Sequence, residues 1–295
     1  MDRTKRAWAA GFFDAEGWAA AVKNRGGTRP FAQINQADAF GVPEVLERFQ
    51  AAVGVGRIGG PQRAPGRIDL YRWVASSRAD VARCFAALHP WLGPVKRGQF
   101  ASAVGPVALP ERAASHDEML AWAAGLFDGD GSTCFERHGT RAGYRRAEMA
   151  ITQTSRAGVP AVLLRFRELF GVGHINGPYG GSTEREPVYR WKAHKLSEIE
   201  AIGQLLWPRL GAVKRMQASN VIVTVAAQPP LPRGNLAWGR HKTHCVHGHE
   251  YATARIRPYR SRSGGPERRA SKQCLACVRE SAQRLYAKEK ARRPE

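Results

Sequence analysis

Apolar and polar residues alternate along the second half of the chain in a pattern that predicts helices and short strands. Ser115 and Glu118 form an S-x-x-E capping box that starts a helix, and Gly131 is placed to end it. After Gly131, the spacing of the apolar residues is typical of strands in some segments and of helices in others. The elements predicted next are strands over residues 132–136 and 144–154 around a turn at 139–143, a helix over 159–170, strands over 172–179 and 187–193, and helices over 196–225 with a break near Gly211.

The first half of the chain repeats this pattern. Residues 8–17 read WAAGFFDAEG, and residues 122–131 read WAAGLFDGDG. Residues 41–61 return as residues 158–178 with 13 of 21 positions identical, and the offset between matching blocks drifts only from 114 to 118. Two copies of one domain explain this order. The predicted organisation is an α+β fold with αββαββα repeats at 1–104 and 115–227, a linker at 105–114, a proline-rich linker at 228–239 and a basic tail at 240–295.

The composition makes a polyanion the expected partner. The 295 residues include 46 Lys and Arg against 25 Asp and Glu, a formal charge of +21. Such a surplus attracts phosphate, so nucleic acid is the leading partner and an anionic membrane surface the second. No apolar run approaches the roughly 20 residues that a membrane-spanning helix needs. Five cysteines, three of them in the last 51 residues, favour metal binding over a disulfide framework and predict an intracellular protein, cytoplasmic or nucleoid-associated.

Each repeated decapeptide combines a smooth helix face with an acid at the helix end. Gly11 and Gly125, each preceded by two alanines, allow two helix backbones to pack closely. Glu16 and Asp130 end these helices, where the carbonyl end repels an anion by about 0.3 to 1 kcal/mol. Bringing both ends together adds like-charge repulsion, which a divalent cation such as Mg²⁺ would offset. The pair is therefore predicted to hold metal against a phosphodiester; ordinary solvated acids are the alternative.

Both decapeptides resemble the signature of the LAGLIDADG homing endonucleases, and the duplication resembles the single-chain, two-repeat branch of that family. The resemblance covers roughly residues 2–226. The motifs depart from the signature at Glu16, where Asp is commoner, and at Phe12, Phe13 and Phe127, which replace aliphatic residues. It implies two pseudo-symmetric domains with saddle-shaped antiparallel sheets. The roles that it implies are Glu16, Asp130 and the carbonyls of Ala15 and Gly129 for the catalytic metal, Gln36, Gln153, Lys96 and Lys214 beside that metal and its waters, and Asp14 and Asp128 for structure.

The resemblance implies a sequence-specific homing endonuclease, or meganuclease, that makes a metal-dependent double-strand break in a long DNA target. The target is expected to be asymmetric and the protein monomeric, because the two copies differ in their strands. Mg²⁺ is the expected cofactor, with Mn²⁺ able to replace it and Ca²⁺ able to bind without supporting cleavage. A free-standing or intron-encoded protein is expected. The alternative function is an RNA-splicing maturase or a non-cleaving DNA-binding protein on the same scaffold. For Lys96 and Lys214, the alternative to a role beside the metal is that both are ordinary surface residues at helix starts.

The predicted strand pairs carry closely spaced cations and amides. Antiparallel ribbons can enter the major groove of DNA, where Arg reads guanine and Gln or Asn reads adenine. Much of any such interface only positions the duplex, so a phosphate contact or a solvated side chain is the alternative at each position. The candidate DNA-binding residues are Lys23, Arg25, Arg29, Gln33, Asn35, Arg57, Arg67, Arg72, Arg137, Arg145, Arg146, His174, Arg185 and Arg190.

The basic tail contains a candidate zinc site. Cys245, His249, Cys274 and Cys277 form a C-x3-H pair and a C-x2-C pair that are separated by 24 residues. Two close pairs of sulfur and nitrogen ligands suit tetrahedral Zn²⁺, and the pattern resembles treble-clef zinc modules. The competing ligands are His241, His244 and His247, and free thiols in a disordered tail are the alternative. The remaining cysteines, Cys84 and Cys134, are expected to be packing residues.

Overall fold

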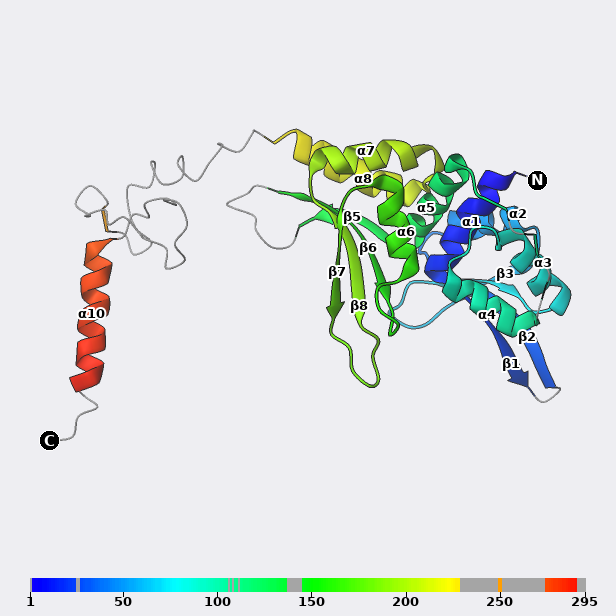
Figure 1. Cartoon of the computed structure of the whole chain (residues 1–295), viewed down its shortest axis with the longest axis horizontal. Coiled ribbons are helices and arrows are strands. Elements are labelled where there is room, and N and C mark those ends of the chain that lie inside the picture. Colours follow the sequence, from blue (N-terminus) through cyan, green and yellow to red (C-terminus); the bar gives the residue numbers. More distant parts are fainter. Residues whose placement is uncertain are drawn as a thin grey trace. The chain divides into compact units, whose positions relative to one another are not determined.

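Two four-stranded antiparallel sheets, each covered on one face by helices, form the larger part of the protein (Figure 1). The computed structural model describes residues 2–24, 27–105, 107, 109–110, 112–136, 145–228, 249–250 and 274–290. Residues 1–228 make one compact unit and residues 229–295 a second. The sheets have the strand orders β1-β2-β4-β3 and β5-β6-β8-β7, so they share one topology.

The two halves of the larger unit contain equivalent elements in the same order. The first half consists of α1 (Arg3–Glu16), β1 (Gly17–Asn24), β2 (Gly27–Ala37), α2 (Glu44–Val53), β3 (Arg57–Gln62), β4 (Leu70–Ala75), α3 (Arg78–Leu88) and α4 (Pro94–Val104). The second half consists of α5 (His116–Asp130), β5 (Gly131–Phe135), β6 (Ala147–Thr154), α6 (Ala161–Phe170), β7 (His174–Tyr179), β8 (Val188–Ala193), α7 (Leu196–Leu206), the 3₁₀ turn η1 (Trp207–Arg209) and α8 (Ala212–Ala226). The two αββαββα patterns predicted from the sequence are therefore confirmed, each closing with a pair of helices.

The boundaries differ from the sequence prediction where proline and glycine fix the backbone. Helix α6 begins at Ala161 instead of residue 159, because Pro160 is its N-cap and disfavours helical backbone before it. Strand β7 begins at His174 instead of residue 172, because Gly173 has φ +75°. A Cβ at Gly173 would lie 2.6 Å from the ring of Trp191, so this turn also needs the missing side chain. The predicted turn at 139–143 lies outside the described residues.

The capping and break signals of the second half are confirmed. Ser115 and Glu118 form both hydrogen bonds of a capping box at the start of α5. Gly131 follows the last residue of α5 with an extended backbone. The predicted break near Gly211 also occurs, since Gly211 is the N-cap of α8 and separates it from η1.

Close contact between α1 and α5 joins the two halves. A Cβ at Gly11 would lie 1.9 Å from the carbonyl oxygen of Trp122, and a Cβ at Gly125 would lie 1.9 Å from that of Trp8. Real Cβ atoms do not approach so closely, so only glycine allows the two backbones to meet here. The buried side chains on both sides of this contact belong to one continuous hydrophobic core.

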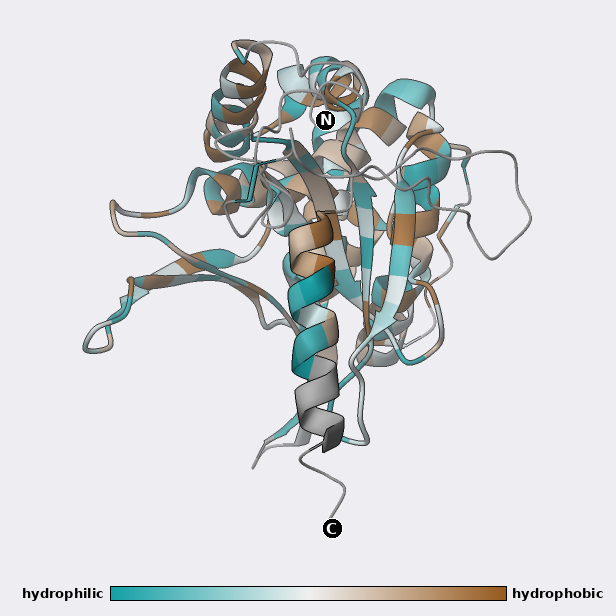
Figure 2. Cartoon of the chain, turned by 90° about the vertical axis from the view of Figure 1, so that its left-hand side faces the viewer, coloured by the Kyte–Doolittle hydropathy of each residue, from teal (hydrophilic) through white to brown (hydrophobic). Residues whose placement is uncertain are grey.

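The strands alternate between this core and an open face. On β2, Ala32 and Ile34 are buried, whereas Asn35 is exposed, and β8 alternates in the same way. Figure 2 shows hydrophobic and hydrophilic residues in turn along the strands. Each sheet therefore has an inner face against the helices and an outer face that none of the described helices of residues 1–228 covers. In the described residues, no helix is both long enough and apolar enough to cross a membrane. The smaller unit contributes α10 (Leu275–Lys290) to the described structure.

Candidate active site

The C-terminal ends of α1 and α5 touch at the two acids that end them. A Cβ at Gly129 would lie 2.3 Å from the Cβ of Ala15 and 3.0 Å from the Cγ of Glu16. Gly129 directly precedes Asp130, so Glu16 and Asp130 approach each other across the helix contact. Both are half-buried, and the chain leaves each helix through a glycine, Gly17 or Gly131, into the first strand of its sheet.

The two acids form an electrostatically unfavourable pair. Burial, together with the negative charge of Glu16, raises the pKa of Asp130 to about 7. Lys96 and Lys214 oppose this shift with their positive charges. Asp130 therefore holds a proton far more readily than an ordinary aspartate, which is the conflict expected where carboxylates are positioned for a cation.

A lysine from each half faces this pair. Lys96 lies in the first turn of α4 and donates a hydrogen bond of 2.5 Å to the carbonyl oxygen of Gly17. Lys214 lies in the first turn of α8 and donates an equivalent bond of 2.5 Å to Gly131. Burial lowers the pKa of both lysines, and nearby carboxylates, including Asp130, oppose that change. Both lysine side chains are half-buried.

A glutamine from each sheet occupies an equivalent register position, and one of the two contacts an acid. Gln36 pairs with Tyr71 near the end of β2, and Gln153 pairs with Tyr189 near the end of β6. The amide of Gln153 also donates a short hydrogen bond to the Asp130 carboxylate. Both glutamines alternate onto the inner face of their sheets, so they lie on the same side as the helix ends.

The other aspartate of each motif cross-links the two halves. Asp14 accepts a hydrogen bond of 2.8 Å from the indole of Trp122, and Asp128 accepts one of 2.8 Å from the indole of Trp8. Both oxygens of Asp14 also accept 2.9 Å bonds from the backbone N–H of Gly93, the N-cap of α4. Burial raises the pKa of each aspartate to about 6, and these donors oppose the shift.

The hydrogen bonds of these aspartates to N-cap glycines also position the helices that carry Lys96 and Lys214. Gly211 donates to both oxygens of Asp128, at 2.9 and 3.0 Å, and is the N-cap of α8. Because each aspartate anchors the start of the helix that carries a lysine, α4 and α8 are held against the helix ends. Sequence reasoning missed the tryptophans and N-cap glycines of this network. Their signal lay in the repeat itself, since Trp8 and Trp122 match, as do Gly93 and Gly211 two residues before each VKR segment.

The outer face of the first sheet presents several predicted DNA-binding residues together. Strand alternation and register place them on neighbouring strands, and Arg72 donates a 2.8 Å hydrogen bond to Asn35. Lys23 alternates to the opposite face, and Arg67 lies in the exposed connection between β3 and β4. The predicted residues on this outer face are Arg29, Gln33, Asn35, Arg57 and Arg72.

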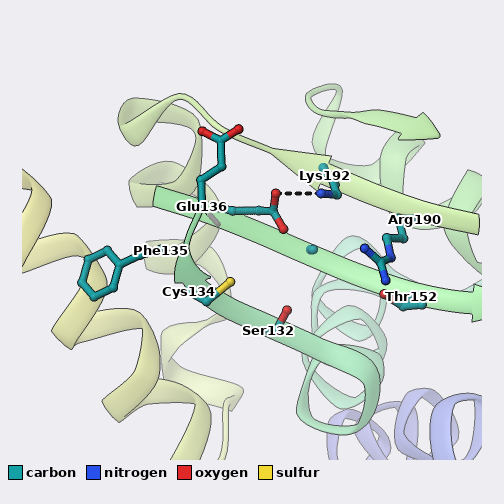
Figure 3. A pocket seen from close by; sticks show the side chains of 9 residues that line it. Ser132, Cys134, Phe135, Glu136, Thr152, Arg190 and Lys192 are labelled. Atoms are coloured by element: carbon teal, nitrogen blue, oxygen red, sulfur yellow. Dashed lines mark hydrogen bonds and ion pairs between the residues drawn. The ribbon is translucent and has the colours of Figure 1, made fainter. Parts of the chain in front are cut away.

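The outer face of the second sheet contains a polar hollow. Figure 3 shows Arg190 and Lys192 lying over the strand that carries Thr152, with Ser132 opposite. Lys192 pairs with Glu148 at 2.7 Å, and Arg190 is exposed. The residues that line the hollow are Ser132, Cys134, Phe135, Glu136, Glu148, Ala150, Thr152, Arg190 and Lys192.

The other predicted DNA-binding residues of the second half lie near the ends of its strands. His174 is exposed on β7 and stacks on His194, with ring centroids 5.6 Å apart. Arg145 lies over the ring of Phe135 at 4.6 Å, Arg146 pairs with Glu136 at 3.5 Å, and Arg185 is exposed between β7 and β8. The predicted site residues that lie outside the described part are Arg25, Arg137 and Cys245, together with the competing zinc ligands His241, His244 and His247.

The two isolated cysteines differ from each other. Cys84 is fully buried in α3, as expected of a packing residue, and burial raises the pKa of its thiol. Cys134 is exposed, so the prediction that it packs in the core was wrong. The physical reason is strand alternation, because Thr133 points inward on β5 and its neighbour must point outward.

Comparison with known proteins identifies this fold. No family model matches the sequence, and no curated protein sequence matches it. The structure is similar to the LAGLIDADG homing endonuclease I-GzeII in complex with its DNA target, at 16% identity over 77% of this chain and 93% of that chain, with a TM-score of 0.53. It is also similar to the LAGLIDADG meganuclease I-AabMI bound to uncleaved DNA, at 14% identity over 75% and 90%, with a TM-score of 0.55. The fold is that of the single-chain LAGLIDADG homing endonucleases.

Proposed function

We propose that this protein is a sequence-specific homing endonuclease that makes a metal-dependent double-strand break in a long, asymmetric DNA target. The observation that carries the proposal is the pair of acids at the touching ends of α1 and α5, faced by an equivalent lysine from each half, with Gln153 bonded to Asp130. The two backbones of a DNA duplex are related by a local twofold axis. A twofold-related pair of reactive clusters on one chain matches that substrate, so a monomer suffices.

The oxygen ligands at the helix ends fit a hard divalent cation. Glu16 and Asp130 would hold Mg²⁺ or Mn²⁺ with the carbonyl oxygens of Ala15 and Gly129, while Ca²⁺ would occupy the site without supporting cleavage. The raised pKa of Asp130 supports this fit, because a cation relieves the repulsion that Glu16 imposes. When bound, the cation supplies Lewis acidity towards water and the scissile phosphodiester.

The protein's own groups complete the chemistry around that position. Lys96 and Lys214 place positive charge where the phosphoryl group gains negative charge in the transition state. Gln153 holds one oxygen of the Asp130 carboxylate in place, and Gln36 would serve the equivalent role for the first half. Because both lysines are also bonded to the carbonyl beyond each acid, they need little reorganisation during the reaction.

The outer faces of the two sheets would read the DNA. Arg72 and Arg190 occupy equivalent positions on β4 and β8, and both can donate to guanine or phosphate from an antiparallel ribbon. The formal charge of +21 supplies the long-range attraction for the duplex. Similar proteins with this fold include I-GzeII, whose structure contains its DNA target.

The test is cleavage of a randomised duplex library by the full chain in Mg²⁺, with recovery and sequencing of the cut molecules. We expect one long asymmetric sequence to be enriched, and no cleavage in EDTA or by a Glu16→Gln, Asp130→Asn double variant. Cleavage that persists in chelator or in the double variant would contradict the proposed site. Binding of DNA or RNA by the wild type without cleavage in Mg²⁺ or Mn²⁺ would instead favour a maturase or a DNA-binding regulator.

A further inference from the structure

Three metal-ligating side chains converge in the smaller unit. His249, Cys274 and Cys277 each offer a ligand atom, and these atoms all lie within 4.8 Å of one another. His249 and Cys274 are separated by 24 residues along the chain, so no local turn brings them together. Two thiols and an imidazole at this spacing are a donor set that suits Zn²⁺ and not the hard cations expected in the larger unit.

We propose that His249, Cys274 and Cys277 hold a structural Zn²⁺ ion, with His249 bound through Nδ1 and oriented by Glu280. Nδ1 of His249 lies 3.3 Å from the sulfur of Cys277, which directs this nitrogen at the thiol cluster. The other ring nitrogen, Nε2, lies 3.4 Å from a carboxylate oxygen of Glu280. A histidine that binds zinc through one nitrogen commonly donates its other N–H to a carboxylate, which fixes the tautomer and the ring orientation.

The start of α10 favours this arrangement. Cys274 directly precedes the helix and is buried, and Cys277 lies in its first turn. The N-terminal end of a helix has partial positive charge, which favours anionic ligands such as thiolates. Glu280 follows Cys277 by three residues and therefore lies on the same side of α10.

A bound ion would explain what holds His249, Cys274 and Cys277 together in a small polar segment. Residues 240–295 contain 15 Lys and Arg against 5 Asp and Glu, a surplus of 15 − 5 = +10. Such a segment has few apolar groups to bury, so metal binding would supply most of its folding free energy. Structural zinc normally has four ligands. The sequence-predicted fourth ligand, Cys245, lies outside the described residues.

The first experiment measures zinc in the purified full chain by mass spectrometry of the metal. We expect about one zinc per chain after reducing purification and dialysis. Cys274→Ser and Cys277→Ser should each lose it, whereas Cys134→Ser, which changes an exposed thiol of the larger unit, should retain it. A wild type without zinc after reconstitution, or full zinc retention by both serine variants, would overturn the proposal.

The second experiment uses the unaltered protein, so it does not depend on how the variants fold. Thiols are alkylated with and without a zinc chelator, and the modified cysteines are located by peptide mass spectrometry. Cys274 and Cys277 should be protected until the chelator is added, and Cys134 should react in both conditions. Reaction of all three without chelator would overturn the proposal. Protection that yields to a reductant instead of the chelator would also overturn it, because that behaviour indicates a disulfide.

The role of Glu280 has a separate readout. Glu280→Gln should still bind one zinc, but about 10- to 100-fold more weakly against a competing chelator, because the orienting carboxylate is lost. Glu280→Asp should restore part of the affinity. Unchanged zinc affinity in Glu280→Gln would show that this carboxylate does not position His249. None of these experiments measures DNA cleavage, so their outcomes are independent of the proposed endonuclease activity.

Discussion

The hydrogen-bonded residues of the inner layers match between the two halves, whereas most residues of the outer faces do not. In the inner layers, equivalent residues make equivalent hydrogen bonds at nearly the same distances. The matched pairs are Trp8 and Trp122, Asp14 and Asp128, and Lys96 and Lys214. Outside, the register places Arg72 and Arg190 at equivalent positions, but most neighbours differ. The differing pairs are Trp18 and Ser132, Phe31 and Glu148, Gln33 and Ala150, Asn35 and Thr152, and Val74 and Lys192.

Under the proposed function, the matched inner layer would perform the chemistry and the differing outer faces would recognise the DNA sequence. Two equivalent phosphodiester bonds would need two equivalent reactive clusters, and the closest point of the helix contact admits only glycine, at Gly11 and Gly125. The bases along a target are under no such symmetry. Apolar and aromatic groups on the first sheet and a Glu–Lys pair on the second would favour different bases, which is why an asymmetric target is expected.

A substitution where α1 and α5 approach each other most closely should cause the largest loss of stability. Gly11→Ala places a Cβ where the carbonyl of Trp122 already lies, at 1.9 Å, so the helices must separate. We expect a loss of at least about 3 kcal/mol in the free energy of unfolding, measured by urea denaturation. Gly125→Ala should cost the same, as the symmetry requires. Gly98→Ala in α4 is the control: a Cβ there meets nothing within 4 Å and should stabilise the helix by about 0.5 to 1 kcal/mol.

Removing a cross-link between the halves should give a smaller, pH-dependent loss. Trp122→Phe deletes the donor to Asp14, and leaving this buried carboxylate short of a partner costs about 1 to 3 kcal/mol. Burial raises the folded pKa of Asp14 to about 6, above its unfolded value. The contribution of Asp14 to the unfolding free energy of the wild type therefore falls as the pH rises towards 6. The lost bond favours the charged form. The cost of the substitution should therefore grow between about pH 5 and about pH 8.

A matched tryptophan controls that experiment. Trp191 donates a 3.1 Å hydrogen bond to the neutral carbonyl of Val172, so Trp191→Phe should cost stability without this pH dependence. Equal losses for Trp122→Phe at both pH values would argue that the bond to Asp14 does not depend on its charge.

The outer faces can be tested one half at a time. Arg190→Ala should weaken DNA binding by about 1 to 3 kcal/mol and relax base preference in one half of the target, whereas Arg72→Ala should do so in the other half. Because both are surface positions, unfolding free energies should change by less than about 0.5 kcal/mol. Loss of preference in the same half-site by both variants would refute the assignment of one sheet to each half.

The paired acids predict a linkage between metal and protons. Because the pKa of Asp130 is raised to about 7, protons compete with Mg²⁺ below that pH. The apparent Mg²⁺ affinity, measured by calorimetry, should fall by up to about tenfold per unit below pH 7 and level off above it. In Glu16→Gln the like-charge repulsion on Asp130 is gone, so the pH above which the Mg²⁺ affinity becomes constant should be lower than in the wild type. A pH-independent affinity for the wild type would contradict the assignment of Asp130 as a ligand.

The repeat made most of the fold predictable, because duplicated motifs fix the order of elements without any alignment. The small face at Gly11, the helix ends at Glu16 and Asp130, and the break at Gly211 all follow from local physical chemistry. The positions of the site residues could be predicted for the same reason, although their roles stay predictions.

Features that depend on contact between the two copies could not be predicted from one copy. The bond from Trp8 to Asp128 joins residues 120 positions apart, and no periodicity in either segment signals it. The exposure of Cys134 and the face of the first sheet on which Lys23 lies depend on strand register, which a one-residue shift reverses. The pairing of Glu148 with Lys192 likewise needed the sheet order.

The most direct test of the central claim is a single-turnover assay on the selected target in which DNA binding and cleavage of each strand are measured together. We expect the Glu16→Gln, Asp130→Asn double variant to bind the target at least as tightly as the wild type while losing cleavage of both strands in Mg²⁺. Cleavage by this variant at the rate of the wild type would contradict the claim that Glu16 and Asp130 form the active site.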